Sequence, residues 1–204
     1  MAQYIYTMNR VSKVVPPKRV ILRDISLSFF PGAKIGVLGL NGAGKSSLLR
    51  LIAGLIHPAQ GRVVIAGGDP ERSIGEQAHY VGHQDAIKPS LTVTENLAFW
   101  SRWLGDGNKV AAALAGVGLG ALAHLPALHL SAGQRRRLSL ARLLAAQRPI
   151  WLLDEPGSVL DAAGGAMLAA IMRVHLAAGG LILAAIHGPL ELEATRELRL
   201  GGTP

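Results

Sequence analysis

The sequence predicts an α/β fold, in which buried parallel strands alternate with helices. Two segments, 149–156 and 181–187, contain short continuous apolar runs, as in parallel strands covered on both faces. A glycine-rich segment at 39–46 stands between an apolar run and a helix pattern, so the order there is strand, loop, helix. The chain has 204 residues, half of them hydrophobic, which is enough for one substantial core. We therefore expect a single domain over residues 1–204.

The first third of the chain contains three strand patterns and one helix pattern. Residues 20–30 alternate apolar and polar side chains, the period of a half-buried strand, and a proline and a glycine at 31–32 end it in a turn. An apolar run at 34–40 predicts a strand that leads into the glycine-rich loop, and a helix pattern follows at 46–55. Another short strand is predicted at 62–68, where two glycines close it.

The middle of the chain breaks the alternation of strands and helices. Thr92 and Glu95 have the spacing of a capping box, and apolar residues follow them at helical intervals. Residues 86–146 are mostly helical in pattern, so we expect a helical subdomain inserted into the α/β core. A further helix is predicted at 165–178, where two glycines end it.

The composition limits the classes of function. A net charge of +8 and a pI of about 10.4 favour an acidic partner, such as nucleic acid or an anionic membrane face, although basic proteins without either are common. The absence of cysteine excludes disulfides, thiolate metal sites and cysteine nucleophiles. The first ten residues lack the apolar core of a signal peptide, so export is not expected. Residues 110–134 carry no Asp, Glu, Lys or Arg, but Pro126, His124 and His129 favour a helix and a loop over a membrane span.

The segment GLNGAGKS at 39–46 matches the G-x-x-x-x-G-K-[ST] loop of P-loop NTPases. Gly42 and Gly44 lack Cβ atoms, so backbone N–H groups can turn toward phosphates, and the following helix adds its positive end. We expect Lys45 to reach the β- and γ-phosphates, and the Ser46 hydroxyl to ligate Mg²⁺. The residues expected to contact the nucleotide here are Gly39, Leu40, Asn41, Gly42, Ala43, Gly44, Lys45, Ser46 and Ser47.

Two carboxylates, Asp154 and Glu155, follow the buried strand pattern directly. An aspartate at the end of such a strand, beside the phosphate loop, can hold Mg²⁺ through water. Its neighbour can point at the attacking water and take its proton. We predict Asp154 as a metal-binding residue and Glu155 as the general base; the alternative is an acidic pair that caps a helix.

A second anion-binding device is predicted in LSAGQ, residues 130–134. Ser131 and Gly133 present a hydroxyl and a bare backbone at the start of a helix pattern. One nucleotide does not need two such devices in the same subunit.

This segment resembles the LSGGQ signature of the ATP-binding cassette (ABC) family. The resemblance implies an ABC-type nucleotide-binding domain, with an antiparallel β subdomain beside the α/β core. It also implies that the signature of one subunit closes over the γ-phosphate held by another, so that a homodimer encloses two ATP molecules with Mg²⁺. The signature residues that would contact ATP are Ser131, Ala132, Gly133 and Gln134.

Three further positions match the family pattern in order. Gln84 matches the glutamine that senses Mg²⁺ and links to the transmembrane partner. The segment SVLD at 158–161, which places Asp161 at the nucleotide, matches the loop after the catalytic glutamate, although Gly157 is unusual before it. His187 matches the switch histidine that contacts the γ-phosphate. The catalytic residues implied are Glu155, His187 and Gln84, and the Mg²⁺ residues are Ser46, Gln84 and Asp154.

Two features leave alternatives open. An aromatic that stacks on adenine usually lies about where Val15 stands; Val15 and Pro16 can still pack against the base, but stacking is lost, so the preference for adenine stays open. The run Arg135–Arg137 is predicted as a solvated or subunit-contacting helix face, with lipid phosphates or RNA as the alternative contact.

Two narrower resemblances cover different parts of the chain. Residues 1–49 are similar to the start of a translational throttle of the ABC-F family, which acts on ribosomes. From about residue 48 onward, the chain resembles the ATPase of the haem exporter of cytochrome c maturation. ABC-F proteins carry two cassettes and a helical linker, for which 204 residues leave no room. We therefore favour the transporter; the alternatives are a ribosome-associated factor or an inactive chimera joined near residues 48–51.

The favoured resemblance implies its partners and its location. Transport would require separate integral membrane subunits, docked near Gln84 and the helical subdomain, with Trp100 and Trp103 either on that surface or in the core. The protein would then lie peripherally on the cytoplasmic face of the inner membrane. A ribosome or other nucleic acid is expected as a partner only under the ABC-F alternative.

Overall fold

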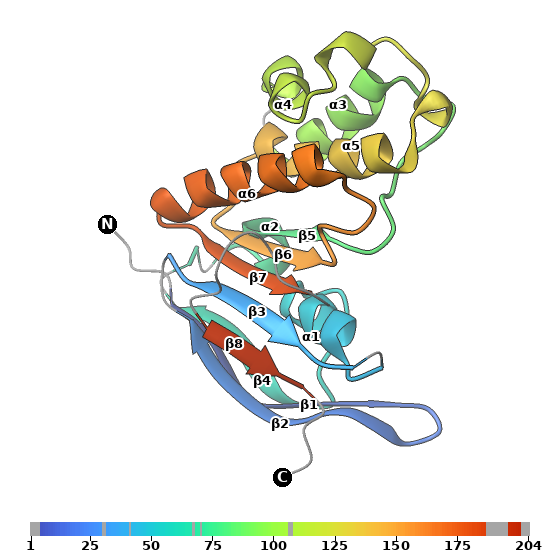
Figure 1. Ribbon diagram of the computed structural model, residues 1–204. Coiled ribbons are helices and arrows are strands. Elements are labelled where there is room, and N and C mark those ends of the chain that lie inside the picture. The colour runs from blue at the N-terminus through green and yellow to red at the C-terminus, as the bar shows by residue number, and fades with distance from the viewer. Residues whose placement is uncertain are drawn as a thin grey trace.

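The computed structural model describes residues 5–29, 32–40, 42–66, 68–69, 71–105, 108–186 and 196–200. Figure 1 shows an antiparallel sheet, a parallel sheet and a group of helices, arranged in that order along the molecule. The elements are β1 (Ile5–Val15), β2 (Arg19–Phe29), β3 (Lys34–Leu38), α1 (Lys45–Ile52), β4 (Gln60–Ala66), α2 (Ile74–Gln77), β5 (Ala78–Val81), α3 (Val93–Leu104), α4 (Val110–Gly116), the 3₁₀ turns η1 (Gly120–Leu122) and η2 (Ala127–His129), α5 (Ala132–Ala145), β6 (Ile150–Asp154), α6 (Ala162–Ala177), β7 (Leu181–Ala185) and β8 (Arg196–Arg199).

The antiparallel sheet has the strand order β2-β1-β4. β1 pairs with both neighbours, but its register against β2 shifts between Met8 and Val11 and again on either side of Lys13. Such bulges break the period-2 alternation of side chains, so the sequence pattern does not predict β1. Met8, Val11 and Leu22 are nevertheless buried, which makes this sheet one wall of the main core.

The parallel sheet has the strand order β5-β6-β7-β3-β8, and every neighbouring pair in it is parallel. The strands at 34–38, 150–154 and 181–185 lie inside the ranges that the sequence predicts. Because the strands are parallel, their carboxyl ends lie at one edge of the sheet, where the ligands of open α/β sheets usually bind. The loops that follow β3, β5 and β6 therefore start from this same edge.

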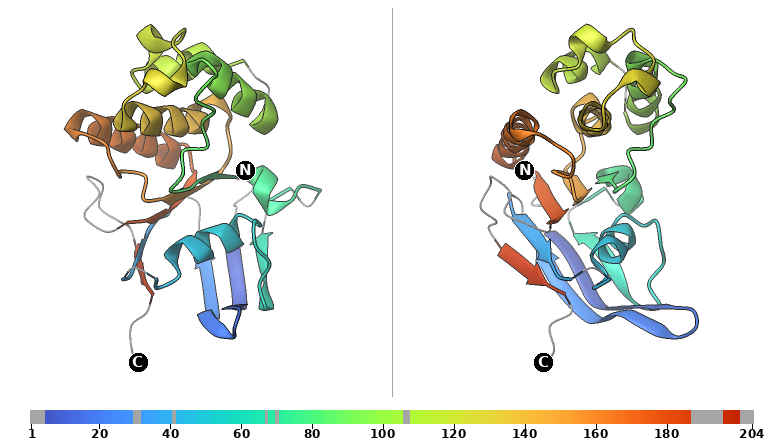
Figure 2. Two further views of the ribbon diagram at one scale, coloured as in Figure 1. Left: turned by 90° about the vertical axis from the view of Figure 1, so that its right-hand side faces the viewer. Right: turned by 45° about the vertical axis from the view of Figure 1, so that its right-hand side comes forward.

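The two faces of the parallel sheet are covered by different elements. Ile150 and Leu152 of β6 belong to a core that includes α1 and the antiparallel sheet. Trp151 and Leu153 belong to a core that α5 and α6 complete on the other face. This alternation places α1 between the two sheets, as the left view of Figure 2 shows. The continuous apolar run of β6 follows directly from burial on both faces.

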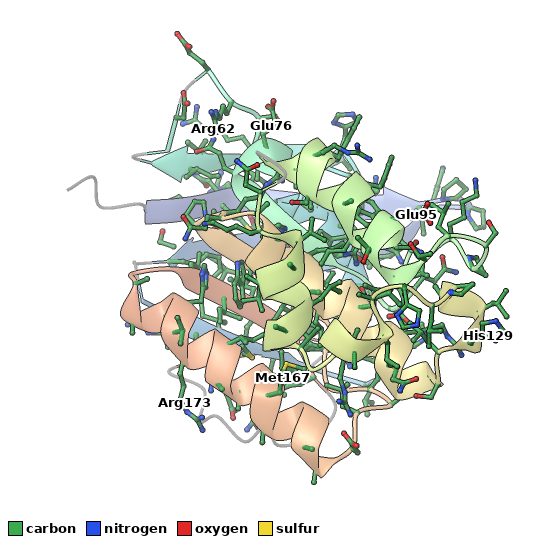
Figure 3. All side chains as sticks on the ribbon, turned by 90° about the horizontal axis from the view of Figure 1, so that it is seen from above. Arg62, Glu76, Glu95, His129, Met167 and Arg173 are labelled. Atoms are coloured by element: carbon green, nitrogen blue, oxygen red, sulfur yellow. The ribbon has the colours of Figure 1, made fainter. Side chains whose placement is uncertain are left out.

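The helical group contains α3, α4 and α5 around a core of its own. Thr92 caps α3 and forms the predicted capping box with Glu95, whose carboxylate accepts the Thr92 N–H at 2.8 Å. Met167 of α6 packs against this core and also against the core of the parallel sheet, so it connects the two (Figure 3). The fold class predicted from the sequence, an α/β core with an antiparallel β subdomain and an inserted helical subdomain, is confirmed.

The segment without charged residues, 110–134, forms short elements. It contains α4, the turns η1 and η2 and the first residues of α5, and both His124 and His129 are exposed. Among the residues that the structure describes, no helix has the length and apolar character needed to cross a bilayer. The predicted helix at 165–178 starts earlier, at Ala162, because the side chain of Asp161 caps it by accepting the N–H of Gly164 at 2.8 Å.

A buried histidine predicts how stability depends on pH. Nε2–H of His79 donates to the carbonyl oxygen of Ala146 at 2.8 Å. Burial lowers the pKa of His79 to about 3; the charges of Arg148 and Arg142 also lower it, and the hydrogen bond to Ala146 opposes the shift. In the unfolded chain a histidine titrates near a pKa of about 6.5. The unfolded state therefore takes up a proton first as the pH falls, so this stabilisation is complete above about pH 6.5 and is lost toward pH 3.

We expect the free energy of unfolding contributed by His79 to fall by about 2 kcal/mol between pH 7.5 and pH 5. His79→Gln keeps an N–H donor for the Ala146 carbonyl but does not titrate, so its loss over this range should be smaller by that amount. Urea unfolding at both pH values measures the difference. The pKa of His175 is also lowered by burial, to about 4, but His175 is present in both proteins. Equal pH dependence of the two proteins would contradict the prediction.

Candidate functional site

The glycine-rich loop between β3 and α1 has a backbone that side chains would not tolerate. Gly39, Gly42 and Gly44 have φ values of 156°, 82° and 94°. A Cβ on Gly44 would lie 2.7 Å from Cγ2 of Ile21, which is closer than real side-chain contacts. Asn41 lies outside the described residues. The glycine spacing of the predicted phosphate loop therefore has a steric cause in this chain.

Lys45 is the first residue of α1, and its side chain bends back over the loop. Only 6% of the residue is exposed, and Nζ donates to the carbonyl oxygen of Gly39 at 2.5 Å. Gly44 precedes it as the N-cap and supplies no side-chain acceptor to the first turn of the helix. The N-terminus of α1 and the ammonium of Lys45 thus lie at the same glycine-rich loop, and N–H groups at a helix N-terminus are suited to bind phosphate. Ser46 and Ser47, both partly buried, continue this first turn.

Asp154 and Glu155 follow one another at the carboxyl end of β6 but have different surroundings. Asp154 is 2% exposed, and its Oδ2 has no hydrogen-bond partner among the described residues. Glu155 has a φ of 50°, and its N–H donates to the carbonyl oxygen of Ala185 on the neighbouring strand at 2.9 Å. Its carboxylate lies 3.8 Å from Nδ1 of His83 and remains about one third exposed. The structure thus separates a buried carboxylate from a solvent-accessible one.

The buried carboxylate of Asp154 fits a divalent cation. Carboxylate oxygens are ligands that Mg²⁺ takes, usually together with phosphate oxygens and water. Oδ2 of Asp154 is buried without a partner in the described part of the chain, which is costly unless a cation or water satisfies it. In the same part of the chain, no three His, Asp or Glu side chains form a cluster that could hold a metal ion.

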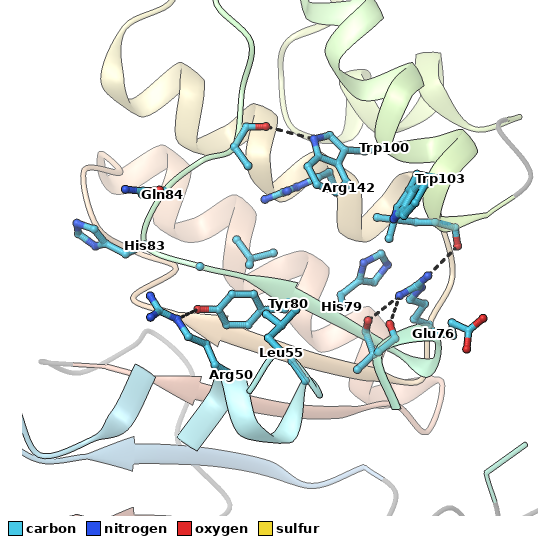
Figure 4. Close-up of a pocket in the computed structure, with 18 residues that line it drawn as sticks. Arg50, Leu55, Glu76, His79, Tyr80, His83, Gln84, Trp100, Trp103 and Arg142 are labelled. Atoms are coloured by element: carbon cyan, nitrogen blue, oxygen red, sulfur yellow. Dashed lines mark hydrogen bonds between the residues drawn. The ribbon is translucent and has the colours of Figure 1, made fainter. Parts of the chain in front are cut away.

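Gln84 lies in the loop after β5, next to His83, and is exposed. It lines a groove of about 790 Å³ that separates α1 and β5 from helix α3 (Figure 4). Since His83 in the same loop lies beside the Glu155 carboxylate, this loop connects the groove with the end of β6. Gln84 thus lies at the groove, one residue away from the side chain that contacts Glu155.

The groove has aromatic and cationic walls. The guanidinium of Arg142 stacks over the ring of Trp100 at 4.7 Å, and Nε1 of Trp100 donates to the carbonyl oxygen of Ala86 at 3.3 Å. Trp103 is 73% exposed at the rim, so core packing does not explain it. Arg50, Arg142 and Arg148 line the groove together with one acidic residue, Glu76.

The signature segment caps the start of α5. Ser131 is the N-cap, its hydroxyl accepts the N–H of Gln134 at 3.2 Å, and the Gln134 side chain accepts the Ser131 N–H at 2.8 Å. Ala132 is exposed, and a Cβ on Gly133 would lie 3.1 Å from the carbonyl oxygen of Val159. Figure 1 places this start of α5 in the helical group and the phosphate loop against the parallel sheet. The two anion-binding devices of one chain therefore lie in different layers.

Asp161 has partners within the chain. Besides capping α6, its carboxylate accepts hydrogen bonds from Nη2 of Arg137 at 3.0 and 3.2 Å. The hydrogen bond from Gly164 is the main cause that lowers the pKa of Asp161. Its predicted contact with nucleotide stays a prediction. His187 lies outside the described residues.

The basic run Arg135–Arg137 differs from its prediction. A solvated or subunit-contacting face is wrong for Arg136, which is 1% exposed. Its guanidinium donates to backbone oxygens after β5 and at the end of β6. A sequence signal for this exists, because Arg136, Leu140 and Leu143 lie four and seven residues apart on one helix face, and both leucines are buried. The charge of the run hides that signal.

Comparisons with known proteins agree with this geometry. A model of the ABC transporter family matches residues 22–158. A cytochrome c biogenesis ATP-binding export protein CcmA from Nitrobacter winogradskyi is 58% identical over 185 residues, which cover 90% of this chain and 92% of that protein. The protein of the same name from Bradyrhizobium diazoefficiens is 55% identical, covering 90% of this chain and 92% of that protein. The one from Agrobacterium fabrum is 48% identical, covering 89% of each.

Solved structures share the fold. A bacterial Atm1-family ABC exporter with ATP bound has a TM-score of 0.82 at 25% identity, covering 98% of this chain and 38% of that one. A dimeric ATP-binding cassette in a post-hydrolysis state with ADP and phosphate has a TM-score of 0.77 at 22% identity, covering 90% of this chain and 88% of that one. The chain described here thus spans about 38% of the exporter's length.

The geometry of the phosphate loop predicts the effect of removing its lysine. Lys45→Ala should raise the Kd for ATP at least about tenfold, because a charge-assisted hydrogen bond to phosphate contributes about 1.5–3 kcal/mol. Lys109→Ala is the control, since Lys109 is an exposed lysine at the start of α4. Titration with a fluorescent ATP analogue gives both constants. If Lys45→Ala bound ATP as tightly as the parent, the phosphate-loop assignment would be wrong.

Proposed function

Because the chain belongs to the ABC transporter family and is a relative of the CcmA export proteins of cytochrome c biogenesis, we propose that it is the ATP-hydrolysing subunit of the haem exporter of cytochrome c maturation. The observation that carries this is the pairing, in one chain, of a phosphate loop and a signature that lie in different layers. Each chain then contributes half of two shared ATP sites. The proposed location is the cytoplasmic face of the inner membrane.

The dimer follows from what each half can bind. The loop around Lys45 and the N-terminus of α1 holds the phosphates from one side. The Ser131 hydroxyl and the N-terminus of α5 in a second copy hold the γ-phosphate from the other side. Two copies related head to tail by a two-fold axis satisfy both contacts at once and bury two ATP molecules. Hydrolysis removes the γ-phosphate that joins the copies, so the dimer reopens.

In each ATP site, Glu155 would act as the general base. Its carboxylate is partly exposed at the sheet edge, where it can accept a proton from the attacking water. Its neighbour Asp154, with Ser46 and Gln84, would hold Mg²⁺, which when bound offsets the charge of the phosphates. His187 would contact the γ-phosphate. The hydroxyl of Ser46 belongs to the first turn of α1, so this one metal contact shares a rigid element with the phosphate contacts.

Membrane subunits would dock in the groove beside Gln84. A bound segment would cover Trp103, which is exposed in the free chain, and its acidic side chains would meet the arginines of the groove. The loop of Gln84 lies at the groove and beside the end of β6, so closure of the ATP dimer would move this loop and with it the docked segment. Binding energy of ATP thereby drives motion in the membrane partner.

The ribosome-associated alternative finds no support among the relatives described above, which carry the transporter name. The alignment with the Nitrobacter winogradskyi protein leaves about 20 of the 204 residues outside it, so it extends across the predicted join near residues 48–51. This continuity favours one transporter-type chain. The resemblance of residues 1–49 to an ABC-F protein, and the join itself, stay predictions.

The assignment of the base predicts a trapped dimer. Glu155→Gln keeps the size and a hydrogen-bonding side chain but cannot take a proton, so ATP should stay bound while hydrolysis falls about 100-fold or more. Size-exclusion chromatography with ATP should then show a stable dimer. Glu71→Gln, an exposed carboxylate outside the site, should hydrolyse ATP at the parent rate. Unchanged turnover in Glu155→Gln would show that another group is the base.

The groove predicts where the membrane partner binds. Trp103→Ala should weaken co-purification with the membrane subunits of cytochrome c maturation at least about tenfold, because exposed tryptophans at interfaces often contribute most of the binding energy. ATP binding should not change. Leu128→Ala, an exposed apolar residue elsewhere on the helical group, serves as the control. Capture of ribosomes in place of membrane subunits would favour the ABC-F alternative.

A further inference from the structure

The guanidinium of Arg136 lies inside the protein, and the mechanism above gives it no task. The residue is 1% exposed and heads the largest fully buried side chains of the described chain. Burial of a charge is costly unless well-placed hydrogen bonds replace its water. The reason for its position must therefore lie in the groups it contacts.

Five hydrogen bonds connect this guanidinium to two loops. Nη1 donates to the carbonyl oxygen of Gly82 at 2.8 Å and to Oδ1 of Asp85 at 3.2 Å. Nη2 donates to the carbonyl oxygens of Asp154 at 2.9 Å and Glu155 at 2.8 Å. Nε donates to the carbonyl oxygen of Pro156 at 3.3 Å. Since a guanidinium is planar, with its donors in fixed directions, it also fixes its acceptors relative to one another.

The two loops held in this way carry the proposed catalytic side chains. Gln84 lies between the two residues bonded after β5, and Glu155 is itself bonded through its carbonyl at the end of β6. Both contacts use backbone atoms or the Asp85 carboxylate, which leaves the side chains of Gln84 and Glu155 outside these bonds. Arg136 therefore holds the backbone that carries these two side chains and makes no hydrogen bond to the side chains themselves.

The same guanidinium is rigidly joined to the signature. Arg136 lies on α5, five residues after its N-cap Ser131, a distance of about 7.5 Å along the helix axis. If α5 shifts, the guanidinium shifts with it. If the loops stayed behind, the buried cation would lose its acceptors and up to three carbonyl groups would lose their partner, which is costly; the Glu155 carbonyl would keep the N–H of Ser158 at 3.1 Å. The loops should therefore follow the helix.

We propose that Arg136 is a positioning residue that couples the signature at the start of α5 to Glu155 and Gln84 of the same subunit. This rests on the proposed ATP dimer, in which each nucleotide contacts the phosphate loop of one copy and the signature of the other. Engagement of Ser131 by the partner's nucleotide moves α5, and Arg136 carries the loops at 82–85 and 154–156 with it. Filling one ATP site thus adjusts the base of the other, so hydrolysis is cooperative in ATP.

Two substitutions separate this role from simple structural support. Arg136→Lys keeps the charge but replaces the fork with a single ammonium, which cannot reach both loops in the same geometry. Arg136→Met also removes the charge. We expect Kd for ATP to stay within about twofold, because Arg136 makes no contact with the phosphate loop. The kcat should fall about 10- to 100-fold, since small displacements of catalytic groups are costly. The Hill coefficient should drop from above 1 toward about 1.

An arginine outside the site supplies the control. Arg173 is an exposed residue of α6 and makes no hydrogen bond to either loop in the described structure. Arg173→Met should keep the kcat and the Hill coefficient of the parent. Thermal melts of all the variants show whether the folded fraction is unchanged at the assay temperature. A merely structural role would lower kcat in proportion to the folded fraction and leave the Hill coefficient as it was.

Hydrogen exchange tests the coupling without depending on turnover. In the intact parent, a non-hydrolysable ATP analogue should protect the first turn of α5 and the loops at 82–85 and 154–156 over one concentration range. In Arg136→Lys, the helix should still be protected while the two loops are not. Parent-like kcat, cooperativity and loop protection in Arg136→Lys would overturn the proposal and leave the ATPase assignment intact. A parent that binds the analogue but does not hydrolyse ATP would contradict the proposed function, while loop protection would still decide the role of Arg136.

Discussion

One constraint organises the molecule: parallel strands end at a common edge. The phosphate loop follows β3, the glutamine loop follows β5, and the carboxylate pair lies at the end of β6, so residues far apart in sequence begin from one edge of the sheet. β5 and β6 are neighbours there, and β7 lies between β6 and β3. The N–H of Glu155 donates to the carbonyl of Ala185, which ties the end of β6 to that of β7. The chemistry is therefore assembled by strand pairing, and the loops only have to be short enough to stay near the edge.

Burial of this sheet on both faces has a second consequence. The main core between the sheets takes up α1, while α5 and α6 cover the opposite face. The two helix N-termini suited to anions therefore belong to different layers of one chain. Both N-termini are partially positive, so each suits a phosphate anion rather than the other N-terminus. The proposed ATP site uses both N-termini, and their separation within one chain is the reason that the proposal builds it from two copies.

Features with local causes could be predicted from the sequence. The capping box of Thr92, the phosphate loop and the apolar strand of β6 each depend on residues within a few positions of one another. The strands β1 and β8 could not be predicted, because bulges interrupt the first, and the second has charged and mostly exposed residues that pair with β3 only through the folded sheet. Arg136 was hidden for the same kind of reason. Its acceptors lie about 20 and 50 residues away in the sequence, and a run of three arginines indicates an exposed surface until those acceptors are placed.

The net charge follows from composition alone, but its effect on partners depends on where the charged side chains lie. The total of +8 suggests a basic exterior, yet Lys34, Lys45, Arg136 and Arg142 are all buried, against one buried carboxylate, Asp154, in the described residues. Part of the excess positive charge therefore lies inside the protein. Lys45 bonds the phosphate loop, and Arg136 bonds carbonyl groups at the sheet edge. A high pI computed from such a chain overstates its attraction to nucleic acid. The electrostatic argument for a partner has to be local. In the groove it rests on the exposed Arg50 and the partly buried Arg148, since Arg142 is buried against Trp100, and on Glu76 being the one acidic residue among the described lining residues.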